Sequence, residues 1–107
     1  MKVAVVFPGQ GSQNKSMLES FENTDTFTKI IDKGSNILDY NIHDIVKDDN
    51  KINNTIYTQP LLLTVSYAMW QTLKYECNFD VTIAAGHSLG EYSALVANES
   101  ITFEDGL

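Results

Sequence analysis

The sequence predicts an α/β fold with a parallel sheet. Two short and unbroken apolar runs, residues 3–7 and 81–85, are typical of strands buried on both faces of such a sheet. The segment between them carries apolar residues at helical spacing, and a tight glycine-flanked turn follows the second run. This order of strand, helices, strand, turn and helix places the chain in the α/β class.

The first strand is closed by Pro8 and Gly9, a turn signal that ends the apolar run. Residues 9–14 then form a polar, glycine-bearing loop. Apolar residues at helical spacing predict a short helix after this loop: Met17, Leu18 and Phe21.

A second helix is expected to begin after Thr24, because threonine is a common N-cap residue. Gly34 lies in its interior and is expected to weaken it. One or two further helical turns are predicted over residues 42–46, and the charged residues 47–51 are expected to be plain solvated surface. The apolar stripe of the second helix consists of Phe27, Ile30, Ile31 and Leu38.

The strongest helix signal begins at residues 58–60, Thr-Gln-Pro. Threonine caps a helix and proline is tolerated in its first turn, so we expect the helix to start there and to end near Tyr75. Met69 and Trp70 are expected to be core residues rather than ligand-binding ones. One face of this helix is lined by Leu62, Ser66, Met69, Trp70 and Leu73.

The composition excludes several functions. With 107 residues the chain is at most one small domain, and 7 Lys+Arg against 14 Asp+Glu give a net charge of -7 that argues against nucleic-acid binding. No stretch approaches the roughly 20 apolar residues of a membrane span, and the run at 3–7 is too short for a signal peptide. Cys77 is the only cysteine, which excludes a disulfide framework or a multi-cysteine metal site. A soluble, cytoplasmic protein without membrane contact is therefore expected.

The motif that carries chemistry is residues 86–90, Gly-His-Ser-Leu-Gly, directly after the second strand. A G-x-S-x-G sequence between a strand and a helix is the arrangement of a nucleophile elbow. In that geometry Ser88 is held out at the helix N-terminus, where the free backbone N–H of Leu89 and the helix dipole favour an oxyanion. The alternative is a glycine-rich turn with an N-capping serine.

The neighbours of Ser88 have supporting roles in this interpretation. Gly86 and Gly90 are needed because a side chain at either place would crowd the crossing backbone, and residues 91–98 continue as a helix. His87 diverges from Ser88 on a sharp elbow, so we expect it to orient the elbow or fill a pocket rather than accept a proton. His43 is expected on the polar surface of a short amphipathic segment.

Three separated stretches resemble one family. They are residues 7–13 (Phe-Pro-Gly-Gln-Gly-Ser-Gln), residues 58–60, and residues 86–92 (Gly-His-Ser-Leu-Gly-Glu-Tyr). In order and spacing, over the whole chain, they look like the malonyl-CoA:acyl carrier protein transacylases, whose acyltransferase domain also occurs in fatty-acid and polyketide synthases.

The resemblance implies an α/β-hydrolase-like core with a smaller ferredoxin-like subdomain, and malonyl transfer in fatty acid biosynthesis. Ser88 would attack the thioester of malonyl-CoA, and malonyl-Ser88 would pass its acyl group to the phosphopantetheine thiol of acyl carrier protein. The oxyanion hole would pair the backbone N–H of Leu89 with that of Gln10, whose loop lies where a parallel sheet presents donors at its carboxyl edge. A simple turn at residues 9–11 is the alternative. No metal or prosthetic group is implied, since both thioester carriers are substrates.

The chain also departs from the family. The resemblance implies a histidine base and an arginine for the malonyl carboxylate, both further along the chain, yet this sequence has no arginine, and neither His43 nor His87 matches the base. Thr102 and Asp105 resemble a capping box that opens a helix just before the last residue. We therefore expect residues 1–107 to be the N-terminal part of one acyltransferase catalytic domain, truncated at its C-terminal end, without the ferredoxin-like subdomain and inactive alone.

Two alternatives stay open. A serine esterase or thioesterase would use the same elbow but pass the acyl group to water, although the loop at Gln10 and the signature at residues 58–60 argue against it. A non-catalytic fragment or binding module is favoured by the missing base and arginine. The sequence does not distinguish malonyl from methylmalonyl or acetyl as the acyl group.

Overall fold

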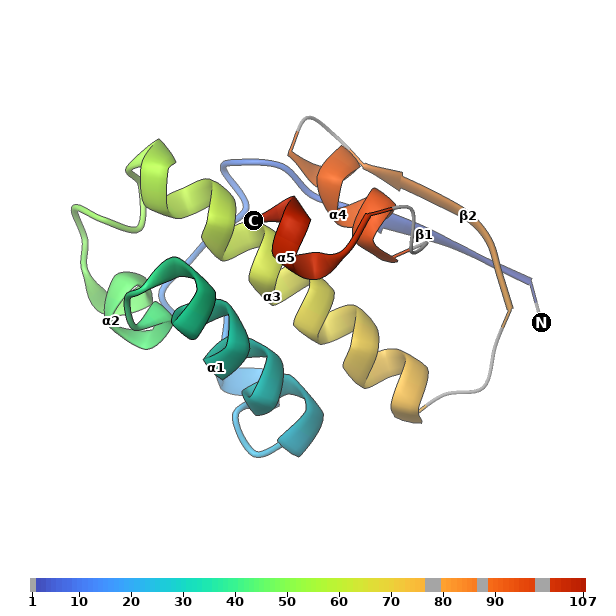
Figure 1. Ribbon diagram of the computed structural model, residues 1–107, viewed down its shortest axis with the longest axis horizontal. Coiled ribbons are helices and arrows are strands. Elements are labelled where there is room, and N and C mark those ends of the chain that lie inside the picture. Colours follow the sequence, from blue (N-terminus) through green and yellow to red (C-terminus); the bar gives the residue numbers. More distant parts are fainter. Residues whose placement is uncertain (1, 77–79, 87–88, 98–100) are drawn as a thin grey trace.

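The sheet consists of two parallel strands in the computed structural model, which describes residues 2–76, 80–86, 89–97 and 101–107 (Figure 1). Strand β1 (Lys2–Phe7) pairs with β2 (Asp80–Gly86), from Lys2 opposite Asp80 to Phe7 opposite Gly86. The predicted strands and their parallel direction are confirmed. Because the strands run in the same direction, the segments that follow Phe7 and Gly86 leave the same edge of the sheet.

Helix α3 (Thr55–Glu76) runs through the centre of the molecule (Figure 1). It contacts α1 (Asp25–Leu38) on one side and α4 (Gly90–Ala97) on another. Helix α4 in turn contacts both strands and α5 (Phe103–Gly106), while α2 (Ile42–Lys47) packs on α1. The central helix therefore separates a helical half of the molecule from a half that contains the sheet.

Helix α1 confirms the predicted apolar stripe, since Phe27 and Ile31 are buried and Ile30 and Leu38 pack against the same cluster. Thr24 is the N-cap residue, but its side chain makes no capping hydrogen bond. The short helix expected around residues 17–21 is a single 3₁₀ turn, η1 (Glu19–Phe21), beside buried Leu18.

Gly34 does more than weaken α1. An added Cβ at this buried glycine would lie 2.6 Å from Thr64 Cγ2 and 3.2 Å from Ile42 Cδ1. The glycine therefore lets α1 approach α3 closely, and this packing offsets its low helix propensity. The sequence alone does not show the partner helix, so this role was not predicted.

The predicted helical turns at residues 42–46 form α2, with Ile42, Ile45 and Val46 all buried. The helix begins after Asn41, whose side chain accepts a hydrogen bond of 2.9 Å from the His43 N–H. At the other end of the chain, the Thr102 hydroxyl accepts from the Asp105 N–H at 3.1 Å, which confirms the predicted cap of α5.

The predicted start of the long helix was wrong. Helix α3 begins at Thr55, where the side chain of Asn54 accepts a hydrogen bond of 3.2 Å from the Ile56 N–H, so Pro60 lies inside the helix rather than in its first turn. Thr58 is fully buried, and its single hydroxyl hydrogen is shared between the Ile52 carbonyl at 2.6 Å and the Asn54 carbonyl at 2.9 Å. Thr58 therefore does not cap α3; its side chain bonds the segment before α3 to the helix.

The predicted face of α3 is only partly buried. Leu62, Ser66 and Trp70 are buried, but Met69 and Leu73 are 36% and 45% exposed. They border an apolar groove beside β1 that is lined by Val5, Val6, Phe7, Pro8, Ser66, Met69, Trp70 and Leu73. The sheet half thus leaves apolar side chains uncovered, and the core role predicted for Met69 was wrong.

The buried apolar residues form two main groups. The helical core joins residues of α1, α2 and α3 with the loops around them: Leu18, Phe27, Ile31, Ile42, Ile45, Val46, Ile52, Leu61, Val65 and Ala68. The sheet core is smaller and consists of Phe7, Trp70, Ala94 and Ala97. A third cluster of Leu63, Val96 and Phe103 joins α3, α4 and α5. Across the described part of the chain, no helix combines the length and the apolar character needed to cross a bilayer.

Candidate active site

The candidate site lies at the edge of the sheet where both strands end. Strand β2 ends at Gly86 and α4 begins at Gly90, so only three residues connect strand to helix, as the elbow interpretation requires. Ser88 and His87 lie outside the described residues, and their predicted roles stay predictions. The predicted helix over 91–98 is confirmed as α4 within the described residues.

Gly90 fixes how closely α4 approaches the first strand. A Cβ added at this buried glycine would lie 2.1 Å from the Phe7 carbonyl oxygen and 3.0 Å from that of Pro8. Both neighbours are backbone atoms, so nothing can turn aside to make room. The crowding that the sequence predicts at Gly90 is present, and it brings the N-terminus of α4 against the start of the glycine-bearing loop.

The loop after β1 is a turn that requires glycine. Gly11 has a φ of 111°, which side chains rarely adopt, and its N–H donates to Gln13 Oε1 at 2.7 Å. The Ser12 hydroxyl donates to the Gly9 carbonyl at 2.8 Å. Gly9 is buried and Gln10 is exposed, which leaves Gln10 at the surface of the same edge as α4. Its backbone N–H as an oxyanion donor stays a prediction.

Two side-chain hydrogen bonds join this loop to the start of α3. Gln10 Nε2 donates to Thr55 Oγ1 at 3.0 Å, and Gln13 Nε2 donates to Asn53 Oδ1 at 2.9 Å. The loop at Gln10 and the segment that leads to the Thr-Gln-Pro signature are therefore neighbours in space, although they are distant in sequence.

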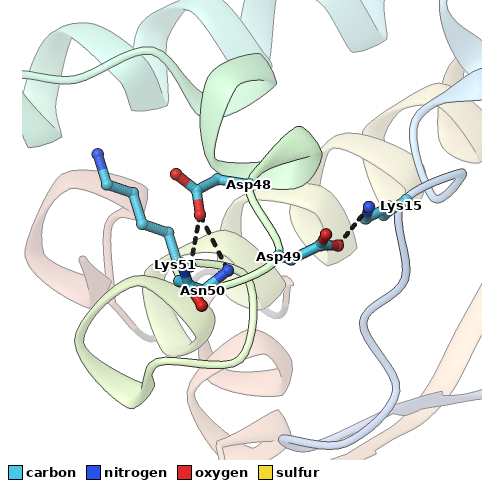
Figure 2. A network of polar contacts seen from close by, with 5 residues as sticks. All are labelled: Lys15, Asp48, Asp49, Asn50 and Lys51. Atoms are coloured by element: carbon cyan, nitrogen blue, oxygen red, sulfur yellow. Dashed lines mark hydrogen bonds and ion pairs between the residues drawn. The ribbon is translucent and has the colours of Figure 1, made fainter.

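The charged residues 47–51 lie at the surface, as the sequence predicts, since all of them except half-buried Asp48 are exposed. Figure 2 shows an ion pair between Lys15 and Asp49, and Asp48 Oδ1 accepting from the backbone N–H groups of Asn50 at 2.9 Å and Lys51 at 3.1 Å. The hydrogen bonds from Lys51 and Asn50 lower the pKa of the Asp48 carboxyl from its ordinary value of 3.8. This segment therefore has its own turn structure and a contact with the loop after β1.

A cavity of about 210 Å³ lies between the beginnings of α3 and α4. It brings Gln59 and Pro60 of the Thr-Gln-Pro signature beside Leu89, the second predicted oxyanion donor. Leu63 and Tyr92 also face it; Tyr92 ends the third motif, but sequence reasoning gave neither residue a role in the site. The position of Tyr92 one turn after Leu89 was the available signal. The lining is Gln59, Pro60, Leu63, Leu89, Tyr92, Gly106 and Leu107.

His43 lies on α2, away from this edge, as the sequence predicts. It lines an open hollow with residues of α1 and of the α1–α2 connection: Asp32, Ser35, Asn36, Asp39, Tyr40 and Asn41. Within the ranges that the structure describes, no group of three or more His, Cys, Asp or Glu residues could hold a metal ion.

Comparison with known proteins places the chain among the acyltransferase domains. Residues 4–107 match the family described as acyl transferase domain, and the chain belongs to that family. Within it, the chain is similar to the malonyl CoA-acyl carrier protein transacylase of Staphylococcus aureus (strain COL), with 41% identity over 109 residues that cover 99% of this chain and 34% of the relative. The resemblance predicted from the three motifs is confirmed.

Solved structures support the same placement. An acyl-carrier-protein S-malonyltransferase from Burkholderia pseudomallei 1710b matches with a TM-score of 0.94 and 41% identity, covering 100% of this chain and 36% of that one. A malonyl-transacylase solved in complex with its type II PKS acyl-carrier protein matches with a TM-score of 0.92 and 36% identity, covering 99% of this chain and 35% of that one. The chain therefore spans about a third of the length of these relatives.

Proposed function

We propose that these residues supply the nucleophile and the oxyanion hole of a malonyl-CoA:acyl carrier protein transacylase. The observation that carries the proposal is family membership over residues 4–107, together with the end of β2 at Gly86 and the start of α4 at Gly90, the two glycines that bound the Gly-His-Ser-Leu-Gly motif. The names of the relatives specify malonyl-CoA and acyl carrier protein as the donor and the acceptor. Fatty acid biosynthesis is the process in which we place this transfer.

The proposed reaction has two steps. Ser88 Oγ attacks the thioester carbonyl of malonyl-CoA, and the tetrahedral intermediate expels coenzyme A to leave malonyl-Ser88. The phosphopantetheine thiol of acyl carrier protein then attacks this ester, releasing Ser88 and carrying the malonyl group away. No metal or prosthetic group takes part. Neither His43 nor His87 is assigned as the base, and Gly86, His87 and Gly90 are assigned to support of the elbow.

The oxyanion hole is assigned to the backbone N–H groups of Gln10 and Leu89. Support comes from the shared sheet edge, where Phe7 is paired with Gly86, and from the contact of Gly90 with the Phe7 carbonyl. These contacts bring the start of α4 against the strand end from which the Gln10 loop departs. We assign the cavity beside Leu89 to the thioester arm of the substrate. Two such backbone N–H groups would stabilise the oxyanion of each step.

The proposal is tested by following the acyl group from labelled malonyl-CoA in the full-length gene product, with and without acyl carrier protein bearing phosphopantetheine. Transfer predicts label on the carrier protein and little free malonate. Release of malonate at the same rate without carrier protein would instead identify a thioesterase. Ser88→Ala serves as the blank, since it should abolish both outcomes while leaving the circular dichroism spectrum unchanged. No label on the carrier protein above this blank would overturn the proposal.

A further inference from the structure

The loop after β1 has little of its own to hold it in place. Gln10, Gly11 and Ser12 are exposed, and of this stretch only Gly9 is buried and Gln13 half-buried. A loop with few apolar contacts and exposed backbone opens easily unless other bonds restrain it. A backbone donor at Gln10 can act only if the loop keeps one conformation, because an oxyanion hole depends on donors that are already aimed.

Two hydrogen bonds provide that restraint, and we call them the loop clasp: Gln10 Nε2 to Thr55 Oγ1 at 3.0 Å and Gln13 Nε2 to Asn53 Oδ1 at 2.9 Å. Gln13 uses both ends of its amide, since its Oε1 also accepts from the Gly11 N–H at 2.7 Å. Asn53 therefore fixes Gln13, and Gln13 fixes the residue that follows Gln10. Thr55 holds the side chain of Gln10 itself.

Asn53 and Thr55, the acceptors of the loop clasp, lie next to residues that are bonded to α3 and packed in the helical core. The buried hydroxyl of Thr58 shares its hydrogen between the carbonyls of Ile52 and Asn54, and the Ile52 side chain belongs to the helical core. Asn53 thus lies in a short segment that the Thr58 hydroxyl bonds to α3, and Thr55 is the first residue of α3 itself. The Lys15–Asp49 ion pair, between exposed side chains, adds an outer contact between the same two segments (Figure 2).

We infer that Asn53 and Thr55 are positioning residues, which act through Gln13 and Gln10 to keep the Gln10 backbone N–H aimed at the reacting carbonyl. The inference rests on the proposed function and adds to it two residues outside the three motifs. The inference also assigns a role in the reaction to the residues at the start of α3. Through Asn53 and Thr55 they restrain an exposed loop at the sheet edge.

The first test asks whether the clasp holds the loop. Thr55→Val keeps the shape of the side chain but removes the acceptor, whereas Thr55→Ser keeps the hydroxyl. In ¹H–¹⁵N spectra, Thr55→Val should move the side-chain amide of Gln10 and the backbone amides of Gln10 and Gly11, and Thr55→Ser should restore them. Thr28→Val on α1 is the matched control and should move neither. Unchanged Gln10 and Gly11 resonances in Thr55→Val would overturn the inference.

The second test measures the rate of malonyl transfer to Ser88 in one turnover of the full-length gene product. Loss of one such hydrogen bond should slow acylation by about three- to tenfold at saturating malonyl-CoA, with an unchanged half-saturating concentration. Thr55→Ser should recover the rate. Because both partners serve one bond, Gln10→Ala combined with Thr55→Val should be no slower than the slower single variant.

The outcomes separate the two proposals. An unsubstituted protein that acylates Ser88, with a Thr55→Val variant equally fast, would overturn the clasp and leave the proposed function standing. Additive losses in the double variant would also overturn it, since they would show that the two residues act independently. A failure of the unsubstituted protein to acylate Ser88 would overturn the proposed function and the positioning role that rests on it.

Discussion

The helical core and the sheet core differ in how completely their side chains are covered. In the helical core, Phe27, Ile31 and Ile42 are almost fully buried by α1, α2 and α3. On the sheet side, Val6 is 74% exposed and Leu73 is 45% exposed along an apolar groove of about 200 Å³. Hence the helical half is closed, whereas the candidate site lies in the less covered half: Gly90 packs α4 against the end of β1 there, and the loop clasp joins the site to the helical half.

The largest effect is expected at Gly90, where α4 packs against the end of β1 in the sheet half. In Gly90→Ala the new Cβ would lie 2.1 Å from the Phe7 carbonyl oxygen, and backbone on both sides leaves no way to relieve the contact. We expect a loss of at least about 3 kcal/mol in the free energy of unfolding, measured by urea titration. Gly34→Ala is the matched control in the helical half. It meets the buried Thr64 side chain at 2.6 Å, a contact with a side chain rather than with backbone, so about 1–3 kcal/mol is expected.

If Gly34→Ala lowers the free energy of unfolding more than Gly90→Ala does, Gly90 of α4 does not pack closely against the Phe7 carbonyl of β1. Adding Thr64→Ser to Gly34→Ala removes the methyl group in question and should restore part of the stability. If this double variant is no more stable than Gly34→Ala alone, the close approach of α1 and α3 does not explain why glycine is needed at position 34.

A second pair of variants compares the two cores directly. Ile31 is 1% exposed, so Ile31→Ala should cost about 2–5 kcal/mol of unfolding free energy through lost burial and a residual cavity. Leu73 is 45% exposed, so Leu73→Ala should cost less than about 0.5 kcal/mol. The same urea titrations measure both. Equal losses would mean that the groove beside β1 is covered in solution.

A third prediction concerns the loop that carries Gln10. Gly11 has a φ of 111°, a backbone conformation that side chains rarely adopt, although no atom lies within 4 Å of an added Cβ. Gly11→Val should therefore change the conformation of the loop without a steric clash. Misdirecting an oxyanion donor should lower the transfer rate by about a hundredfold or more in a steady-state assay. Gln10→Ala keeps the backbone donor and should be milder. If both variants transferred malonyl at the original rate while folded, this loop would not belong to the site.

The smallest effect is expected from Asp48, whose pKa is lowered by hydrogen bonds from the backbone N–H groups of Lys51 and Asn50. A carboxyl whose folded pKa is depressed stabilises the fold above its ordinary pKa of 3.8 and loses that contribution as the pH falls through the folded value. The stability difference between the unsubstituted protein and Asp48→Asn should therefore be small and constant near neutral pH and should shrink below 3.8. A difference that grows on acidification would contradict the assignment.

The features of the fold that could be predicted from the sequence are those that depend on residues close together in the chain. Unbroken apolar runs identified both strands, Thr102 marked the start of α5, and the spacing of Phe27 and Ile31 identified the buried face of α1. The start of α3 was misplaced because Asn54 and Thr58 are both capping residue types, and only the burial of Thr58 against Ile52 shows which of them caps.

Contacts between distant segments could not be predicted in the same way. The clasp joins residues 45 and 40 positions apart, and Gly34 meets Thr64 on another helix. No local periodicity pairs such residues, since each is an ordinary polar or small residue in its own segment. For the same reason the sequence identified Leu89 as a donor but not Tyr92 and Leu63 as its neighbours in the cavity.

The central claim is that Ser88 is the nucleophile, and the most direct measurement is the position of the acyl group after brief exposure of the full-length gene product to malonyl-CoA. Protease digestion and peptide mass spectrometry should find the malonyl adduct on Ser88, within the peptide that contains Gly86 and Gly90, and addition of acyl carrier protein should remove it. An adduct on Cys77, on another serine, or on no residue of this chain would contradict the account.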